Sequence, residues 1–252
     1  MTGSPSGLPD QGVLRVKLYA RICFAIIGLI AINAQASIVL GGTRIIYPEN
    51  KKEVQISIKN KEDANKYLIQ SWVTKTDNTK APFIITPPIY KMDANGQALL
   101  HIVFIGDKGS LPQDRESMFV ANFKSVSAMP DELKDKNTLQ FAMKTQLKLF
   151  WRPVSLKESA AAGAWEKLRF SRQGSQLTAK NPTPFHVSLL ELSVGGKRVK
   201  PLADSSVPES LSMTIPPFGE QIFSIPAAAV GDVSWAAVND YGAATVKKRQ
   251  QL

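Results

Sequence analysis

The stretch that decides the fold is Leu139-Gln140-Phe141-Ala142-Met143-Lys144-Thr145-Gln146-Leu147-Lys148-Leu149, the longest alternating run in the chain. Its odd-numbered positions are mostly apolar, and its even-numbered positions are mostly polar. Because successive side chains of a β-strand point to opposite faces, this pattern predicts a strand with one apolar face. Core strands alternate in the same way, so the pattern alone leaves open whether that face packs inside the protein or against a partner.

Shorter strand-like runs fill the rest of the chain. In Glu53–Lys59, for example, Val54, Ile56 and Ile58 alternate with polar residues, which is typical of a half-buried strand. Asn, Gly and Pro residues separate the runs at the spacing of a β-sandwich. The other expected strands are Ser37–Leu40, Arg44–Tyr47, Tyr67–Thr74, Phe83–Thr86, Leu99–Ile105, Met118–Ser125, Trp165–Arg172, Gln176–Lys180, His186–Leu192, Ser212–Ile215, Glu220–Ile225, Val233–Asn239 and Ala243–Lys247.

The beginning of the chain is predicted to be a secretory signal. Arg15, Lys17 and Arg21 precede the apolar run Ile22–Ile32, and Ala34-Gln35-Ala36 supplies a small-x-small cleavage pattern. An uncleaved membrane anchor is the alternative, but the run is shorter than the roughly 20 residues that cross a bilayer. We expect cleavage after about Ala36, which leaves 216 of the 252 residues.

A chain of that length suits two β-sandwich domains of about 100 residues each. Lys157–Ala164 is rich in alanine and is expected to be a linker with a helical turn. The sequence therefore predicts an all-β protein with a signal at residues 1–36 and domains at residues 37–156 and 157–252.

Cysteine usage and charge limit the classes of function. The single cysteine, Cys23, lies inside the signal, so the exported chain has no disulfide. The net charge is +10, and without the signal 28 basic and 20 acidic residues remain. The lysines are scattered, without the aromatic-interleaved patch that single-stranded nucleic acids require. We expect a protein partner, no nucleic acid, and no stable membrane insertion after cleavage.

The residues offer no catalytic constellation. His101 and His186 both fall in expected strands, where a partly exposed structural histidine is the simplest interpretation. They lack metal-ligand spacing, and no glycine-rich phosphate loop or nucleophile elbow occurs. Arg115 separates Asp114 from Glu116, which favours ion pairing. The sequence predicts a non-enzymatic protein without metal or cofactor, and an exported hydrolase is a poorly supported alternative.

An ordered set of motifs points to one family. The set is Thr43-Arg44-Ile45-Ile46-Tyr47-Pro48, Tyr67-Leu68-Ile69-Gln70-Ser71-Trp72, Thr86-Pro87-Pro88, Leu111-Pro112-Gln113-Asp114-Arg115-Glu116-Ser117, Leu147-Lys148-Leu149-Phe150-Trp151-Arg152-Pro153, Glu166-Lys167-Leu168, Asn181-Pro182-Thr183-Pro184 and Asn239-Asp240-Tyr241-Gly242. In this order it resembles the periplasmic pilus (chaperone–usher) chaperones, the PapD-like family. The resemblance covers essentially all of the chain after the signal.

The resemblance implies two immunoglobulin-like sandwiches in an L shape. It also implies a periplasmic protein that binds pilus subunits by donor-strand complementation and delivers them to an outer-membrane usher. By motif alignment, the side chains lent to the subunit are those of Leu139, Phe141 and Met143, with weaker involvement up to Leu147. The alternative is an exported adhesin or fibre component. That alternative predicts an incomplete sandwich or an N-terminal extension, whereas the exported chain runs directly into an expected strand.

The resemblance also assigns two charged groups of residues. Arg44 and Lys148 match the basic pair that holds the C-terminal carboxylate of the subunit, through charge-assisted hydrogen bonds. Taken alone, each is an ordinary strand cation. Lys148 is an even-numbered residue, so on a flat strand it would face away from the apolar row formed by Leu139, Phe141 and Met143. A bulge or strong twist could bring them to one face.

Glu116, Arg152 and Asp240 match an ion-pair network that sets the angle between the domains. Gln146, His101 and Lys91 depart from the family pattern, which has arginine at these positions in many members. The loop Pro130–Asn137 is short and no cysteine pair is present, which indicates the short-loop subclass that serves rod-like pili.

Overall fold

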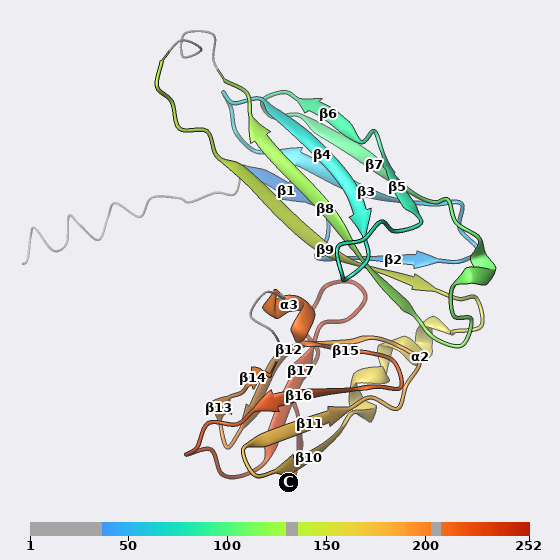
Figure 1. Ribbon diagram of the computed structural model, residues 1–252, viewed down its shortest axis with the longest axis vertical. Helices are drawn as coiled ribbons and strands as arrows, with labels where there is room; N and C mark the ends of the chain where they lie inside the picture. Colours follow the sequence, from blue (N-terminus) through green and yellow to red (C-terminus); the bar gives the residue numbers. More distant parts are fainter. Residues whose placement is uncertain (1–36, 130–135, 203–207) are drawn as a thin grey trace, which may run out of the picture. The chain divides into compact units, whose positions relative to one another are not determined.

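The computed structural model describes residues 37–129, 136–202 and 208–252 (Figure 1). The expected signal and its cleavage site lie outside the described residues, as does most of the loop Pro130–Asn137. The described chain consists mainly of β-strands, in two groups that each enclose a separate core. The expected all-β architecture of two sandwiches is therefore confirmed.

Two sheets form the first group. The first is wholly antiparallel, and the second has one parallel pair, β2 with β9. The first has the order β1-β3-β7-β5, and the second has the order β2-β9-β8-β4-β6. The strands of the first sheet are β1 (Ile38–Leu40), β3 (Glu53–Asn60), β7 (Gln97–Phe104) and β5 (Phe83–Thr86); those of the second are β2 (Arg44–Pro48), β9 (Ala142–Arg152), β8 (Ser117–Ser127), β4 (Tyr67–Thr74) and β6 (Ile89–Met92). The sheets pack through apolar side chains such as Ile58, Leu100, Leu149 and Trp151, which are fully buried.

The second group is built in the same way. Its sheets have the orders β10-β11-β16-β14 and β13-β12-β17-β18, with β15 paired to β12. The strands are β10 (Arg169–Gln173), β11 (Gln176–Lys180), β16 (Glu220–Ser224), β14 (Lys200–Pro201), β13 (Lys197–Arg198), β12 (Val187–Val194), β17 (Val233–Ala237), β18 (Lys248–Gln250) and β15 (Thr214–Ile215). Leu177, Phe223, Val233 and Trp235 are among the buried residues between these sheets.

Short helices connect the strands: α2 (Glu158–Ala162), α3 (Glu209–Ser212), and the 3-10 helices η1 (Lys108–Ser110) and η3 (Ala164–Lys167). The helical turn expected in Lys157–Ala164 is confirmed by α2. The expected strand Ser212–Ile215 is wrong at its start, because Ser212 ends α3.

Other strands also differ from the expectation: the expected strand Trp165–Arg172 begins only at Arg169, because Trp165 lies in η3. Strand β6 was not expected, because it follows Pro87-Pro88 directly and has only four residues. The last strand is β18 at Lys248–Gln250, and not Ala243–Lys247. Ala244 makes only an isolated bridge, to Val238, because the turn at Asn239–Gly242 brings the chain back close to the end of β17.

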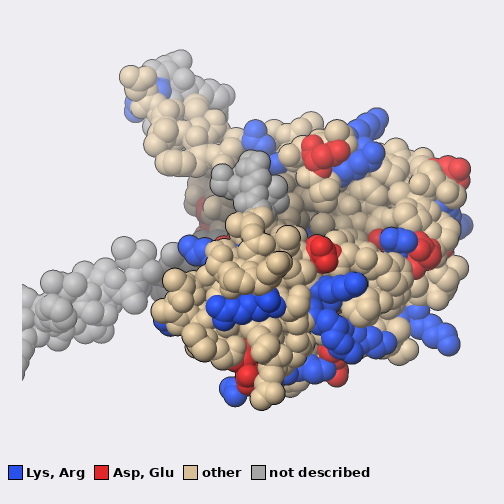
Figure 2. Space-filling model, turned by 60° about the horizontal axis from the view of Figure 1, so that its bottom comes forward, with Lys and Arg blue, Asp and Glu red and all other residues tan. Residues whose placement is uncertain are grey.

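The surface carries the charge that the sequence indicated. Lys and Arg side chains gather on the face drawn in Figure 2, with Asp and Glu between them. The interspersed acidic residues make this face a mixed one and not a continuous basic stripe.

Candidate functional site

Strand β9 has one edge that is only partly covered. Along one side it pairs with β8 without interruption, from Val126 opposite Ala142 to Ser117 opposite Trp151. Along the other side it pairs with β2 in parallel, but only from Lys148 onward. In the described part of the chain, residues 142–147 therefore have no partner strand on that edge. An open edge of this kind presents backbone groups that another strand can pair with.

Apolar side chains stand exposed at the start of β9 and in the segment just before it, so the strand expected from Leu139 begins only at Ala142. Leu139, Phe141 and Met143 are 80%, 75% and 61% exposed. Together with Ile38 and Tyr67 they line a hollow of about 420 Å³ beside the first sandwich. Large apolar groups that gather in this way on a surface typically mark an interaction site.

Leu147 belongs to the same row but not to the same surface. It is 7% exposed and packs in the core of the first sandwich with Leu149 and Trp151. Its side chain is therefore not available to a partner in this structure, and the expectation that it contributes is corrected.

The register of β9 shows to which face of the strand Lys148 points. The β8–β9 ladder contains no bulge between Ala142 and Trp151. Leu147 and Leu149 point into the core, so Lys148 points to the opposite face. Met143, the member of the apolar row that lies within β9, and Lys148 therefore point to opposite faces of one regular strand, and no bulge reconciles them.

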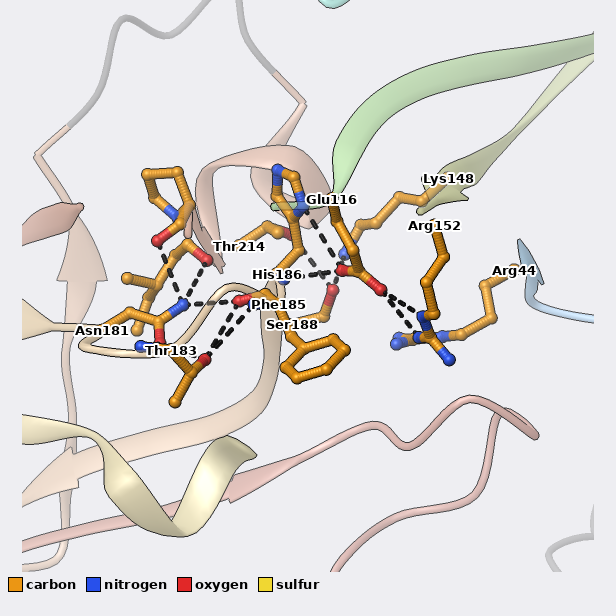
Figure 3. Close-up of polar contacts among 12 residues, drawn as sticks. Arg44, Glu116, Lys148, Arg152, Asn181, Thr183, Phe185, His186, Ser188 and Thr214 are labelled. Carbon is orange, nitrogen blue, oxygen red and sulfur yellow. Dashed lines mark hydrogen bonds and ion pairs between the residues drawn. The ribbon is translucent and has the colours of Figure 1, made fainter. Parts of the chain in front are cut away.

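Arg44 and Lys148 are neighbours on that opposite face. Arg44 is the first residue of β2 and pairs with Lys148 in the parallel ladder. Both side chains reach residues of the second group of strands, and Figure 3 shows the contact of Lys148 with Ser188. Arg44 Nη1 donates to the carbonyl oxygen of Val238 at 2.8 Å, and Lys148 Nζ donates to Ser188 Oγ at 3.0 Å. Ser188 Oγ lies 3.3 Å from Thr214 Oγ1, which completes a short hydroxyl chain.

Within the described residues, this basic pair makes no direct contact with a carboxylate. Burial, and then the nearby charge of Arg44, lowers the pKa of Lys148 from its ordinary value to about 7. Burial also lowers the pKa of Arg44, while Asp240 and Glu116 act in the opposite direction. None of the ion pairs within residues 37–129, 136–202 and 208–252 includes either cation. The Nε atom of Arg44 is buried without a hydrogen-bond partner there. The pair is therefore suited to an anion from outside, above all a carboxylate.

Arg152 connects the two groups of strands. Its guanidinium donates to Glu116 Oε1 from Nε at 2.8 Å and to Asp240 Oδ2 from Nη1 at 2.7 Å. Glu116 and Arg152 are only 4% and 7% exposed. Glu116 Oε2 also accepts from the backbone nitrogen of His186 at 2.8 Å (Figure 3). Each oxygen of the buried Glu116 carboxylate thus has a donor, as a buried charge requires.

Two asparagine turns support this network from the second group. The Nδ2 atom of the buried Asn181 donates to the carbonyl oxygen of Phe185 at 2.7 Å, one residue before His186. Asn239 Oδ1 accepts from the backbone of Tyr241 and of Ala243, at 3.0 and 2.9 Å. Because these side chains shape the turns on either side, they hold the partners of Arg152 in place.

Sequence reasoning missed part of this site. Ser188 and Thr214 carried no signal, since isolated hydroxyls in strands are common. The interpretation of His186 as a partly exposed strand histidine is wrong: its side chain is 8% exposed, and it lies just before β12 with Nδ1 3.5 Å from Glu116 Oε2. His101 does lie in a strand, with Nδ1 2.9 Å from Glu53 Oε1.

The described residues offer neither a metal site nor a membrane-spanning helix. The described residues contain no group of three or more His, Cys, Asp or Glu that could hold a metal ion. Among the same residues, no helix combines the length and the apolar character that crossing a membrane requires.

Comparisons with known proteins agree with these features. A family model described as "Pili and flagellar-assembly chaperone, PapD N-terminal domain" matches residues 37–157, and "Pili assembly chaperone PapD, C-terminal domain" matches residues 163–249. The chaperone protein FimC of Escherichia coli O6:H1 is 36% identical over 231 residues, which cover 91% of this chain and 90% of that protein.

Solved structures show the same likeness. The complex of the Salmonella enterica SafA pilin with the SafB chaperone matches with a TM-score of 0.72 and 29% identity, over 87% of this chain and 98% of that chain. The periplasmic chaperone SfaE matches with a TM-score of 0.66 and 34% identity, over 84% and 98% of the two chains. These relatives favour a chaperone over an adhesin or a fibre component. The chain belongs to the PapD-like family of pilus-assembly chaperones.

Proposed function

We propose that this chain is a periplasmic chaperone that binds pilus subunits by donor-strand complementation and delivers them to an outer-membrane usher. One observation carries this proposal. The exposed apolar row Leu139, Phe141 and Met143 runs from the segment just before β9 into its open edge, and that edge ends at the basic pair Arg44 and Lys148. An incomplete partner sandwich receives the apolar side chains, and its terminal carboxylate meets the two cations.

Burial of the apolar row supplies much of the binding energy. Each of these side chains contributes roughly 1.5–3 kcal/mol when it passes from water into an apolar groove. Three of them together are large on the scale of a protein–protein affinity. Because they are largely exposed in the free chaperone, most of this gain remains available to the partner.

The course of β2 supports a direction for the partner strand. Strand β2 occupies the edge of β9 from Lys148 onward and runs parallel to it. A partner strand can therefore use only the part of the edge before Lys148. For its terminal carboxylate to reach Arg44 and Lys148, it must run parallel to β9 and end where β2 begins. The basic pair then sets the register of the apolar row in the groove.

The comparisons support the partner class. The SafB chaperone was solved in complex with a pilin, and this chain is similar to it over most of both lengths. The basic pair Arg44 and Lys148 (the anchor) and the apolar row Leu139, Phe141 and Met143 (the donor row) would bind the same partner from the two faces of β9.

Co-expression with a candidate pilus subunit tests the proposal. We expect Arg44→Glu and Lys148→Glu each to abolish recovery of the complex, since reversal places a carboxylate against a carboxylate. Lys59→Glu on β3 is the matched control, because Lys59 is an exposed lysine on the other sheet. Circular dichroism must show that all three variants are folded. Normal complex yield from both anchor variants would rule out the anchor.

Delivery needs a separate experiment. The purified complex is mixed with a peptide that has the N-terminal extension of a second subunit, with or without the usher in detergent. We expect subunit transfer in the absence of nucleotide, and faster transfer with the usher. A complex that releases no subunit under either condition contradicts the delivery step.

A further inference from the structure

Two lysines face each other across strands β8 and β9. Lys124 and Lys144 are direct partners in the antiparallel ladder. Lys144 Nζ lies 5.5 Å from the ring centroid of Trp72 on β4. Neither lysine forms an ion pair among residues 37–129, 136–202 and 208–252. Like charges directly opposite each other in a ladder destabilise the sheet, so this pair costs free energy in the isolated chain.

Lys144 stands on the same face of β9 as Lys148. Even-numbered residues of β9 point away from the core, and Ala142, Lys144 and Gln146 are the ones that border the open edge. Gln146 Nε2 donates to Asn122 Oδ1 at 2.9 Å, which fixes this amide in the sheet. A strand added to the edge would therefore meet one free cation at Lys144, a neutral amide at Gln146 and the basic pair at Lys148.

Lys144 leans across β8 toward Trp72 on β4, away from the open edge of β9. A cavity of about 340 Å³ on that side is lined by Lys144, Gln146, Val120 of β8 and Leu211, and by the turn that contains Asp77. Asp77 is the acidic group on this lining, but its Oδ1 atom accepts from the backbone nitrogen and the hydroxyl of Thr79, at 2.9 and 2.6 Å. Asp77 is thus held by its own turn and does not form an ion pair with Lys144.

We propose that Lys144, with Lys124 behind it, selects subunits that carry an acidic side chain about four residues before the C-terminal carboxylate. This inference rests on the proposed function. Two parallel strands rise equally, by about 3.3 Å per residue. When the terminal carboxylate of the partner strand is bound at Lys148, the partner residue about four positions earlier therefore lies beside Lys144. Four is an even number of residues, so the side chain of that partner residue points to the same face of the sheet as Lys144. There it relieves the repulsion between the two lysines.

Synthetic peptides provide the test. The probes are peptides that alternate Val and Thr, end in a free carboxylate and are long enough to reach from Lys148 to Leu139. One set carries Asp, Asn or Lys at the fourth residue before the C-terminus, a second set carries Asp at the third or fifth residue, and a third ends in an amide. Their affinities for the full-length exported chain are measured by fluorescence anisotropy at low and high salt.

We expect the Asp peptide to bind about two- to fivefold more tightly than the Asn peptide, as an opposite-charge cross-strand pair does. The Lys peptide should bind most weakly, and high salt should reduce the differences. Asp at the third or fifth residue should give no gain, because its side chain points to the other face. Lys144→Glu should reverse the order of the Asp and Lys peptides. Lys91→Gln, on β6 of the same sheet, is the matched control and should leave the order unchanged.

The outcomes separate this inference from the proposed function. If carboxylate peptides bind no more tightly than amidated peptides, the anchor fails and the inference falls with it. If the carboxylate preference holds but Asp, Asn and Lys peptides bind equally, or Lys144→Glu leaves their order unchanged, only the role of Lys144 is overturned.

Discussion

Arg44 and Lys148 are paired residues of one parallel ladder, and each donates a hydrogen bond to the second group of strands, at Val238 and Ser188. The two cations thus lie where the sandwiches meet, with hydrogen bonds to neutral oxygens and no carboxylate contact within the described chain. A partly buried pair of basic side chains is held there against its own repulsion. This arrangement makes the affinity for an anion depend on pH.

Affinity for a pilus subunit should fall above neutral pH. The pKa of Lys148 in the free chaperone is about 7, and a carboxylate beside it raises that pKa in the complex. The complex then holds more protons than the free partners, so affinity is greatest near and below pH 7. Above pH 7, the affinity should decrease by up to about tenfold per pH unit. Titration calorimetry in two buffers of different ionisation enthalpy should detect proton uptake. Lys148→Met should abolish the uptake, and uptake that persists in this variant would assign it to another group.

Breaking the Glu116–Arg152 pair should destabilise the fold strongly. Glu116→Gln leaves the buried guanidinium of Arg152 with one fewer charge partner, and removing one member of a buried pair costs about 3–5 kcal/mol. Urea unfolding measures the change. Arg198→Gln is the control, because it breaks the exposed pair with Glu209 and should change stability by less than about 1 kcal/mol. Equal effects of the two substitutions would contradict this account.

Gly242 should not tolerate a side chain. Its φ angle is +84°, and an added Cβ would lie 2.5 Å from Thr43 Oγ1 in the segment just before β2. We expect Gly242→Ala to lower stability by about 1–3 kcal/mol and to weaken subunit binding, because Thr43 adjoins Arg44. Gly163→Ala is the control, since nothing lies within 4 Å of its added Cβ and its φ angle is −98°. Thermal unfolding of the two variants makes the comparison, and unchanged unfolding of Gly242→Ala would show that this turn is free to move.

Substitutions at Phe141 and Leu149, which are both odd-numbered members of the alternating run, should have opposite effects on subunit binding and on stability. Phe141 is 75% exposed, whereas Leu149 is fully buried. Phe141→Ser should change stability by less than about 0.5 kcal/mol but abolish recovery of a subunit complex. Leu149→Ala should cost about 2–5 kcal/mol of stability, because it leaves a cavity in the core. A normal complex from folded Phe141→Ser would remove this residue from the donor row.

The alternating run at residues 139–149 predicted a strand, which the structure begins only at Ala142, but not which of its side chains are buried and which are exposed. Alternation reports only which side chains share a face, so Phe141 and Leu149 looked equivalent. They differ because the core of the first sandwich ends near Leu147, and this depends on which strands cover each part of β9. Ser188 and His186 were missed for a similar reason: their contacts join residues far apart in the chain, and no local pattern encodes them. Glu116, Arg152 and Asp240 were singled out through family motifs and not through their spacing.

The opposite orientation of the apolar row and of Lys148 has a consequence for breadth of recognition. Besides the burial of the apolar row, a partner strand at this edge is held by its peptide groups and by its terminal carboxylate, and every polypeptide has both. Only a few side chains on each face remain to distinguish one client from another. A chaperone built in this way can serve several different clients, and changes of single residues along β9 can tune its preferences without altering the fold.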